Sequence, residues 1–348
     1  MYSEIIGEIY NQYYSMSDYN TGNYRLNSIG WNSSFTGAPY TAEEMTEWRD
    51  NTLSIIRSTC PEKILEIACG TGMMLFGLVK DAKKYTGVDI AQEGIKYIKA
   101  HLSPQEASRT DLWVMNAAQI SNLPDNDYDL AFINSATQYM GPAEEFTQCV
   151  EQMTQKVRQN GTIFLGDMKS DWLRELFYKT CLMFNGSSEN ISTQLEQKYK
   201  HDFEFYISLD YISSLAYSIP RVKKAQPILK RGKMPTEMNL FRYDCILYLD
   251  EAPDLEYPRI DCTNMSLQEI SDAVAADGRN RLRLCGMRNK LIIDIAYAKT
   301  GISCDASVTL YIDDVCCLLE KLGFTAYAVP DINGGIDSFD IMISGSGE

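Results

Sequence analysis

The stretch Leu65-Glu66-Ile67-Ala68-Cys69-Gly70-Thr71-Gly72 decides the fold of this 348-residue chain. It is a short apolar run that ends in two glycines, and a second apolar run further on ends in Gly87-Val88-Asp89-Ile90. Glycine lets the backbone approach a ligand without an intervening Cβ. An acid about 20 residues after such a loop is well placed to bind ribose hydroxyls. The pattern predicts a nucleotide-type cofactor beyond the carboxyl ends of two parallel strands.

Strands and helices alternate along the chain on both sides of this motif. We expect strands at 63–67, 85–89, 112–115, 128–134 and 161–167, and helices at 73–80, 91–101 and 144–159. Thr41 is suited to cap a helix that runs to about residue 58. Regular alternation of this kind is typical of a doubly wound, mostly parallel α/β sheet.

The order is less regular after Asp167. We expect helical segments at 172–184 and 191–217, followed by two strands at 221–231 and 242–249 that could pair antiparallel. A linker at 250–257 then leads to a small α/β appendage. The appendage is expected to have helices at 267–276, 291–299 and 312–322 and strands at 324–329 and 339–344. The chain is therefore expected to have three parts: an N-terminal helical and lid segment (1–60), a cofactor-binding core (61–250) and the C-terminal appendage (251–348).

Composition excludes several classes of function. The formal net charge of −15 disfavours nucleic acid, whose phosphates are bound by clusters of Lys and Arg. No apolar run approaches the roughly 20 residues of a membrane span, and the acidic N-terminus does not resemble a signal peptide, so we expect a cytoplasmic protein. The ten cysteines form no Cys-x-x-Cys motif and there are only two histidines, so we expect buried thiols and no metal site.

The glycine-rich loop suits either NAD or S-adenosylmethionine (SAM). The fingerprint of NAD sites has a third glycine, which is missing here because Met73-Met74-Leu75 follow Gly72. Glu66, on the strand before the glycines, suits the amino group of a methionine moiety better than a pyrophosphate. The residues therefore favour SAM, with S-adenosylhomocysteine (SAH) as the product.

Together the two motifs resemble the E-x-G-x-G-x-G loop and the following acid of class I SAM-dependent methyltransferases, with Ala68 where glycine is usual. This resemblance implies a Rossmann-like core. Further segments are similar to the methyltransferase domains embedded in nonribosomal peptide synthetases; they are 30–37, 134–139, 166–170, 241–244, 286–291 and 339–341. The resemblance covers nearly the whole chain, from about residue 9 to residue 344.

The resemblance implies N-methylation of the α-amine of an aminoacyl or peptidyl group held on a carrier protein. The sequence starts at Met1 without an adenylation or carrier segment, so we expect a stand-alone form acting in trans on a carrier protein or synthetase. Two alternatives stay open: methylation of a free small molecule on N, O or C, and intramolecular cyclisation of SAM without methyl transfer. The appendage could also be a binding module that recruits a synthetase partner.

Twelve residues are expected to bind the cofactor; they are Trp31, Glu66, Ala68, Gly70, Gly72, Asp89, Ile90, Asn116, Ala117, Asn134, Ser135 and Tyr139. Asn116 stands where many methyltransferases have an acid that binds the adenine amino group. Either its side-chain carbonyl or backbone groups near Ala117 would replace that acid. Trp31, in the Gly-flanked loop 30–37, suits a lid residue or a core anchor.

Methyl transfer from a sulfonium mainly requires positioning, and an amine acceptor must also lose a proton. Asp167 and Glu237 are the candidate proton acceptors, and Tyr139 with Gln138 would orient the amine. Arg242 would hold a carbonyl or pair with one of the two acids. Each has a structural alternative: Asp167 as a helix cap, Glu237 as a solvated loop charge and Arg242 in an ion pair on a strand.

Overall fold

The computed structural model describes residues 2–16, 23–187, 190–254, 256–331 and 333–345. Its centre is a seven-stranded sheet in the order β3-β2-β1-β4-β5-β7-β6. The strands are β1 Lys63–Ile67, β2 Lys84–Asp89, β3 Thr110–Val114, β4 Tyr128–Asn134, β5 Val157–Lys169, β6 Val222–Leu229 and β7 Arg242–Leu249. Strands β1 to β5 pair in parallel, whereas β7 runs antiparallel to both β5 and β6. The expected doubly wound, mostly parallel sheet is confirmed.

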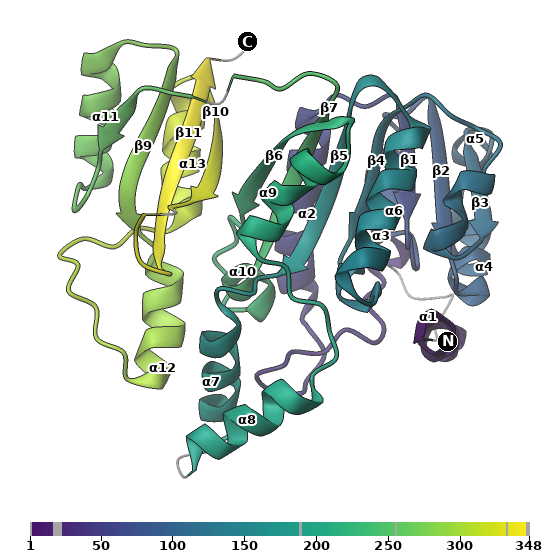
Figure 1. Ribbon diagram of the computed structural model, residues 1–348, viewed down its shortest axis with the longest axis horizontal. Coiled ribbons are helices and arrows are strands. Elements are labelled where there is room, and N and C mark those ends of the chain that lie inside the picture. The colour runs from purple at the N-terminus through teal and green to yellow at the C-terminus, as the bar shows by residue number, and fades with distance from the viewer. Residues whose placement is uncertain (1, 17–22, 188–189, 255, 332, 346–348) are drawn as a thin grey trace.

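Helices cover both faces of this sheet (Figure 1). On one face lie α2 Ala42–Ser58, α3 Met73–Leu78 and α4 Gln92–His101, and on the other lie α6 Ala143–Lys156 and α9 Leu209–Ser218. Ile64 of β1 packs into the first core and Leu65 into the second. Since both faces are covered, the central strands β1 and β4 are mostly apolar and largely buried. Thr41 caps α2 in a capping box with Glu44, as expected.

Several helices lie beyond the carboxyl ends of the strands. Helix α1 Tyr2–Ser15 packs near α4, while α7 Arg174–Phe184 and α8 Ile191–His201 continue from the end of β5 and lie below the sheet in Figure 1. The remaining short helices of the core are η1 Tyr24–Leu26, α5 Pro104–Ala107, η2 Ala117–Asn122, η3 Thr137–Tyr139 and α10 Glu237–Phe241. Of these, η2 and η3 follow β3 and β4, and α10 precedes the antiparallel β7, so these three lie at the end of the sheet where ligands bind in open α/β folds.

A second sheet of four strands, in the order β10-β11-β9-β8, lies beside the β6 edge (Figure 1). Its strands are β8 Arg259–Asp261, β9 Arg281–Arg288, β10 Phe324–Pro330 and β11 Ser338–Gly345. Helices α11 Leu267–Asp277 and α13 Ile312–Lys321 complete a separate core, and η4 Ile292–Tyr297 with α12 Ala298–Thr300 extend from it.

Strands β8 and β9 are missing from the sequence prediction because arginines interrupt their apolar pattern. The expected helix at 291–299 is mostly a π-helix, η4.

The second sheet is joined to the core by ion pairs, since Arg231 binds Asp313 at 3.1 Å and Lys233 binds Asp314. The division into three domains stays a prediction.

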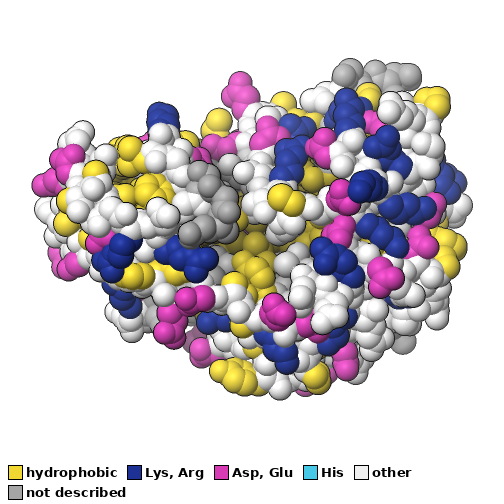
Figure 2. Space-filling view, turned by 90° about the horizontal axis from the view of Figure 1, so that it is seen from above, with side chains coloured by type: hydrophobic (Ala, Val, Ile, Leu, Met, Phe, Trp, Pro, Cys, Tyr) yellow, Lys and Arg dark blue, Asp and Glu magenta, His cyan; other side chains and the backbone are white. Residues whose placement is uncertain are grey.

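The surface of the molecule carries both signs of charge. In Figure 2, acidic and basic side chains are interspersed, and Lys and Arg form no unbroken area on the face seen there. All ten cysteines are free thiols, and most are buried. Within the described ranges, no helix combines the length and apolar character that crossing a membrane requires.

Candidate active site

A pocket of about 490 Å³ lies at the carboxyl ends of β1, β2 and β4. All but one of the expected cofactor residues line it; they are Trp31, Glu66, Ala68, Gly70, Asp89, Ile90, Asn116, Ala117, Asn134, Ser135 and Tyr139. Gly72 is the exception. It begins α3 with φ +83°, and a Cβ there would lie 2.8 Å from Ile98 Cγ1 of α4. Gly72 therefore serves the turn and the helix packing.

The loop between β1 and α3 turns through left-handed backbone. Gly70 has φ +53°, and a Cβ at this position would lie 2.9 Å from the hydroxyl oxygen of Tyr14. Ala68 also has a positive φ, +59°, which costs an alanine roughly 1–2 kcal/mol relative to the right-handed region. This strain explains why glycine is usual at that position in the resembling motif.

Asp89, at the end of β2, holds this loop in place. Its Oδ2 accepts a hydrogen bond from Gly70 N, and its Oδ1 accepts one from Ala91 N, both at 2.7 Å. Burial raises the pKa of Asp89 to about 6, although these two backbone donors oppose the shift. Each carboxylate oxygen keeps a second lone pair, so ribose hydroxyls can still bind here.

Glu66 and Asn134 line the pocket with oxygen atoms that suit an amino group. Burial raises the pKa of Glu66 to about 8, despite the hydrogen bond that its Oε2 accepts from Tyr85 Oη at 2.7 Å. A cationic amino group would stabilise the carboxylate of Glu66. Asn134 Oδ1 is buried without a hydrogen-bond partner among the described residues. The pocket therefore fits the methionine end of SAM.

Asn116 follows β3 and uses its side chain locally. Its Oδ1 accepts a hydrogen bond from Ala118 N at 2.9 Å and caps η2. This bond leaves the second lone pair of the carbonyl oxygen, so the Asn116 side chain and the backbone groups near Ala117 both stay predictions for binding the adenine amino group.

Sequence reasoning missed the tyrosines of α1. Tyr10 and Tyr14 line the pocket, and Tyr10 Oη donates to Tyr139 Oη at 3.1 Å. The signal was the spacing of four that places Ile6, Tyr10 and Tyr14 on one face of a helix. Helix α1 thus forms a wall of the pocket.

The loop 30–37 is anchored rather than free. Trp31 lines the pocket and also packs edge-on against Trp48 of α2, with ring centroids 4.9 Å apart, which fits the expected core anchor, while its role as a lid stays a prediction. Phe35 is buried and stacks on Phe184 at 4.7 Å. The loop is a fixed wall of the site in this conformation.

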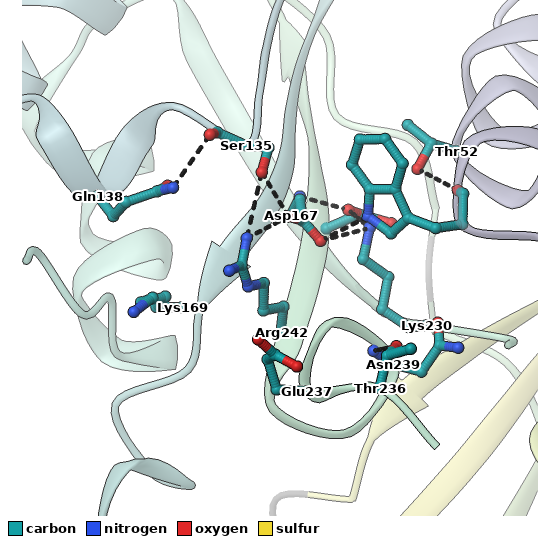
Figure 3. A network of polar contacts seen from close by, with 12 residues as sticks. Thr52, Ser135, Gln138, Asp167, Lys169, Lys230, Thr236, Glu237, Asn239 and Arg242 are labelled. Atoms are coloured by element: carbon teal, nitrogen blue, oxygen red, sulfur yellow. Dashed lines mark hydrogen bonds and ion pairs between the residues drawn. The ribbon is translucent and has the colours of Figure 1, made fainter. Parts of the chain in front are cut away.

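A buried charge network lies at the ends of β5, β6 and β7 (Figure 3). The side chain of Asp167 is fully buried and accepts hydrogen bonds from Trp48 Nε1 at 2.9 Å and Ser135 Oγ at 2.7 Å. It also pairs with Arg242, and Lys230 Nζ lies 3.5 Å from its Oδ1. Burial alone would raise the pKa of Asp167, but the two cations and the hydrogen bonds lower it to about 2.

This geometry decides between the alternatives for Asp167 and Arg242. Asp167 lies within β5, and α7 begins only at Arg174, so the helix-cap alternative is wrong. Arg242 forms the expected ion pair with Asp167, and its Nη1 also donates to Ser135 Oγ at 3.1 Å. A carboxylate this acidic is a poor proton acceptor. We therefore propose that Asp167 positions Arg242.

Glu237 begins α10 and is only 3% exposed, so the alternative of a solvated loop charge is wrong. Its Oε1 accepts a hydrogen bond from Ser34 N at 2.8 Å, and its Oε2 forms none in the described part of the chain. Figure 3 shows Glu237 beside Arg242. Gln138 donates to the Ser135 carbonyl at 3.0 Å, so its amide is fixed next to the same cluster.

Residues 64–161 match a family model described as a methyltransferase domain. The chain therefore contains a methyltransferase domain, and the pocket at its strand ends fits SAM. The chain is 27% identical over 285 residues to a probable nonribosomal peptide synthetase of Salinispora arenicola, covering 80% of this chain and 4% of that protein. It is 26% identical over 233 residues to the chondramide synthase of Chondromyces crocatus, covering 66% of this chain and 6% of that protein.

The methyltransferase thus spans less than a tenth of the length of these curated relatives. Among solved structures, the geranyl diphosphate C-methyltransferase of Streptomyces coelicolor A3(2) is 10% identical, with a TM-score of 0.47 over 72% of this chain and 98% of that chain.

Proposed function

We propose that this methyltransferase N-methylates an amino acid, or an aminoacyl or peptidyl amine, in nonribosomal peptide or related natural-product biosynthesis. The relatives described as peptide synthetases support this acceptor class, because one of them aligns with 80% of the chain and not only with residues 64–161. As expected from the sequence, we place the reaction in the cytoplasm, with a carrier protein or synthetase as partner.

The observation that carries the proposal is a pair of complementary groups beside the cofactor pocket. The hydroxyls of Tyr10 and Tyr139 lie in the pocket wall, and the guanidinium of Arg242 binds Ser135 of the same wall. An α-amino acyl group presents an amine and a carbonyl two bonds apart. The hydroxyls can accept hydrogen bonds from the amine and the guanidinium can donate to the carbonyl, which fits such a group.

SAM bound in the pocket supplies an activated methyl group on its sulfonium. The residues of this chain then hold the acceptor and manage its proton. Burial raises the pKa of Tyr10 above its ordinary value, so Tyr10 stays protonated and orients the amine without acting as a base. Glu237 is the remaining candidate to accept the amine proton, since Asp167 is locked in its ion pairs.

The test is incubation with SAM and matched acceptors, followed by mass spectrometry of both products. The acceptors are aminoacyl carrier proteins and the corresponding free amino acids. SAH together with a methyl mass gain on an amine supports the proposal, and the acceptor that gains mass shows whether a carrier is needed. Methylation only of oxygen or carbon would overturn it, as would methylthioadenosine without any methylated acceptor, which indicates cyclisation of SAM.

A further inference from the structure

We propose that a second cavity, of about 340 Å³, holds the uncharged amide-containing chain attached to the amine that is methylated, and that the C-terminal appendage forms one wall of it. The proposal rests on the proposed function for the class of acceptor. It adds a binding site for the body of the acceptor and a role for the second sheet.

The cavity lies along the same edge of the sheet as the cofactor pocket. Trp172 follows β5, Leu229 and Lys230 come from the end of β6, and Arg242 begins β7. Because β7 is antiparallel, its first residue lies at the edge where β5 and β6 end. The cofactor pocket occupies the ends of β1, β2 and β4. The two cavities therefore share the edge at which ligands bind in open α/β sheets.

Arg242 links the linings of the two cavities. Arg242 lines the second cavity, and its Nη1 donates to the hydroxyl of Ser135, which lines the cofactor pocket. Figure 3 shows the guanidinium of Arg242 directed at Ser135 and Asp167. A chain in the second cavity would thus end at the group proposed to hold the acceptor carbonyl, with its amine directed toward the cofactor pocket.

The lining favours an uncharged chain over an ionic ligand. Apolar contact comes from Trp172, Leu209, Leu229, Leu240, Ile292 and Ile312. The buried charges of the lining are already paired, because Lys230 Nζ binds Asp244 Oδ1 at 2.6 Å and Asp337 Oδ2 accepts from Arg288 Nε at 2.7 Å. Asn239 and Asn289 add amide groups. Apolar walls with a few fixed polar groups are typical of sites for organic ligands.

The cavity is bounded by residues far apart in the sequence. Leu209, at the start of α9, lies on the side of the core, whereas Ile312 begins α13 and Ile336 lies just before β11 in the appendage. The appendage therefore completes the cavity, which a seven-stranded core alone would leave open. This explanation differs from the expectation that the appendage recruits a partner protein.

The experiment narrows the cavity from both walls. Leu209→Trp enlarges a side chain on the core wall, and Ile336→Trp enlarges one on the appendage wall. Tyr217→Trp is the matched control, because Tyr217 lies on the same helix as Leu209, is 91% exposed and lines neither cavity. Circular dichroism melting identifies a variant that fails to fold, in which case the other narrowing variant decides.

The long probe is an aminoacyl amide of amino-pantetheine, and the short probe is the simple carboxamide of the same amino acid. That amino acid is the one the wild-type protein methylates best, or alanine if it methylates none. Calorimetric titrations in the presence of SAH are expected to show about tenfold weaker binding of the long probe to both narrowed variants. Binding of the short probe and of SAH should not change, and Tyr217→Trp should behave as wild type.

Two outcomes overturn the inference: the long probe fails to bind the wild-type protein, or it binds the narrowed variants as tightly as the wild type. Mass spectrometry of the same samples with SAM separates this result from the fate of the proposed function. Narrowing-sensitive binding without a methyl mass gain would refute N-methylation and leave the cavity assignment standing. Equal methylation of the long probe by the narrowed variants and the wild type would support N-methylation and refute the cavity assignment.

Discussion

The two halves of the sheet edge are built differently. At the ends of β1 and β2, a short contiguous loop holds the site through backbone geometry, and Asp89 ties that loop to the second strand. At the ends of β5, β6 and β7, side chains from several elements meet in one buried charge network around Asp167. We call the first region the cofactor half and, after the proposed function, the second region the acceptor half. Under that proposal, cofactor recognition depends on local sequence and acceptor recognition depends on long-range contacts.

The carboxyl groups of the two halves also respond oppositely to burial. In the cofactor half, burial raises the pKa of Glu66 to about 8 and that of Asp89 to about 6. In the acceptor half, Arg242 and Lys230 overcome burial and hold the pKa of Asp167 at about 2. The first half can change protonation when a cationic ligand binds, and the second is a fixed ion cluster.

The largest effect is expected from Asp167→Asn, which removes the central charge of the acceptor half. Arg242 would lose its buried carboxylate partner, so the free energy of unfolding should fall by roughly 3–5 kcal/mol near neutral pH. Urea unfolding at a series of pH values checks this. Because the folded pKa lies below the unfolded one, the stabilisation is present above about pH 4 and is lost as the pH falls toward 2.

The control for this prediction is Asp111→Asn. Asp111 pairs with Lys84 at 2.5 Å on the surface of β3, and both side chains are at least one-third exposed. Such a pair contributes about 0–1 kcal/mol. Equal losses of unfolding free energy in the two variants would show that the buried network stabilises the fold no more than a surface ion pair. The contrast between the halves would then be wrong.

Glu66→Gln tests the cofactor half. Removing the carboxylate that faces the amino group should weaken SAM binding by about ten- to a hundredfold, the range expected for hydrogen bonds to charged groups. Since Glu66 is mostly protonated in the free protein at pH 7, binding of a cationic amino group to the wild type should release protons. Calorimetry in buffers of different ionisation enthalpy measures this release, which the variant should lack.

The same variant has a consequence for stability. Because the folded pKa of Glu66 is raised, the SAM-free wild type should lose stability as the pH rises from about 4.5 to 8, and Glu66→Gln should flatten this dependence. Glu62→Gln is the control, since Glu62 forms a surface pair with Lys83 just before β1. Proton release that persists in Glu66→Gln would assign the titration to another group, with Asp89 the first to examine.

The sequence predicted the cofactor half well, because its signals are local. Strands β1, β2 and β4 were expected from the sequence, the glycines come shortly after β1, and Asp89 is the last residue of β2. All but one of the expected cofactor residues line one pocket. Gly72 differs because its glycine is required by packing against Ile98, a contact that the motif alone does not reveal.

The acceptor half was harder to predict for a physical reason. Asp167, Glu237 and Arg242 are identifiable as polar residues near strand ends, but their roles depend on which charges face one another after folding. Lys230 and Trp48 carry no signal in the sequence, although both contact Asp167. Strands β8 and β9 were missed for the same reason. Arg283 and Arg288 of β9 form ion pairs with Asp340 and Asp337, and these pairs exist only in the folded appendage.

Tyr10→Phe tests the boundary between the halves. It removes the hydroxyl that donates to Tyr139 in the pocket wall, which should lower kcat by about threefold to tenfold, as expected for one neutral hydrogen bond. Steady-state kinetics with the acceptor identified by mass spectrometry would measure it. Tyr13→Phe, on the exposed side of the same helix, should have no effect. A change in the KM for SAM alone would assign Tyr10 to the cofactor half.

The smallest expected effect is a gain, from Ala68→Gly. Ala68 has φ +59°, and relief of this left-handed strain is worth roughly 1–2 kcal/mol. Glycine also increases the entropy of the unfolded chain, which offsets roughly 0.4–1 kcal/mol of the gain. Thermal unfolding should therefore show a net stabilisation of about 0.5 kcal/mol, with Ala131→Gly, in the middle of β4, destabilising instead. A loss of stability in Ala68→Gly would mean that the alanine methyl group contributes packing within the loop, and the cofactor half could then not be described by backbone geometry alone.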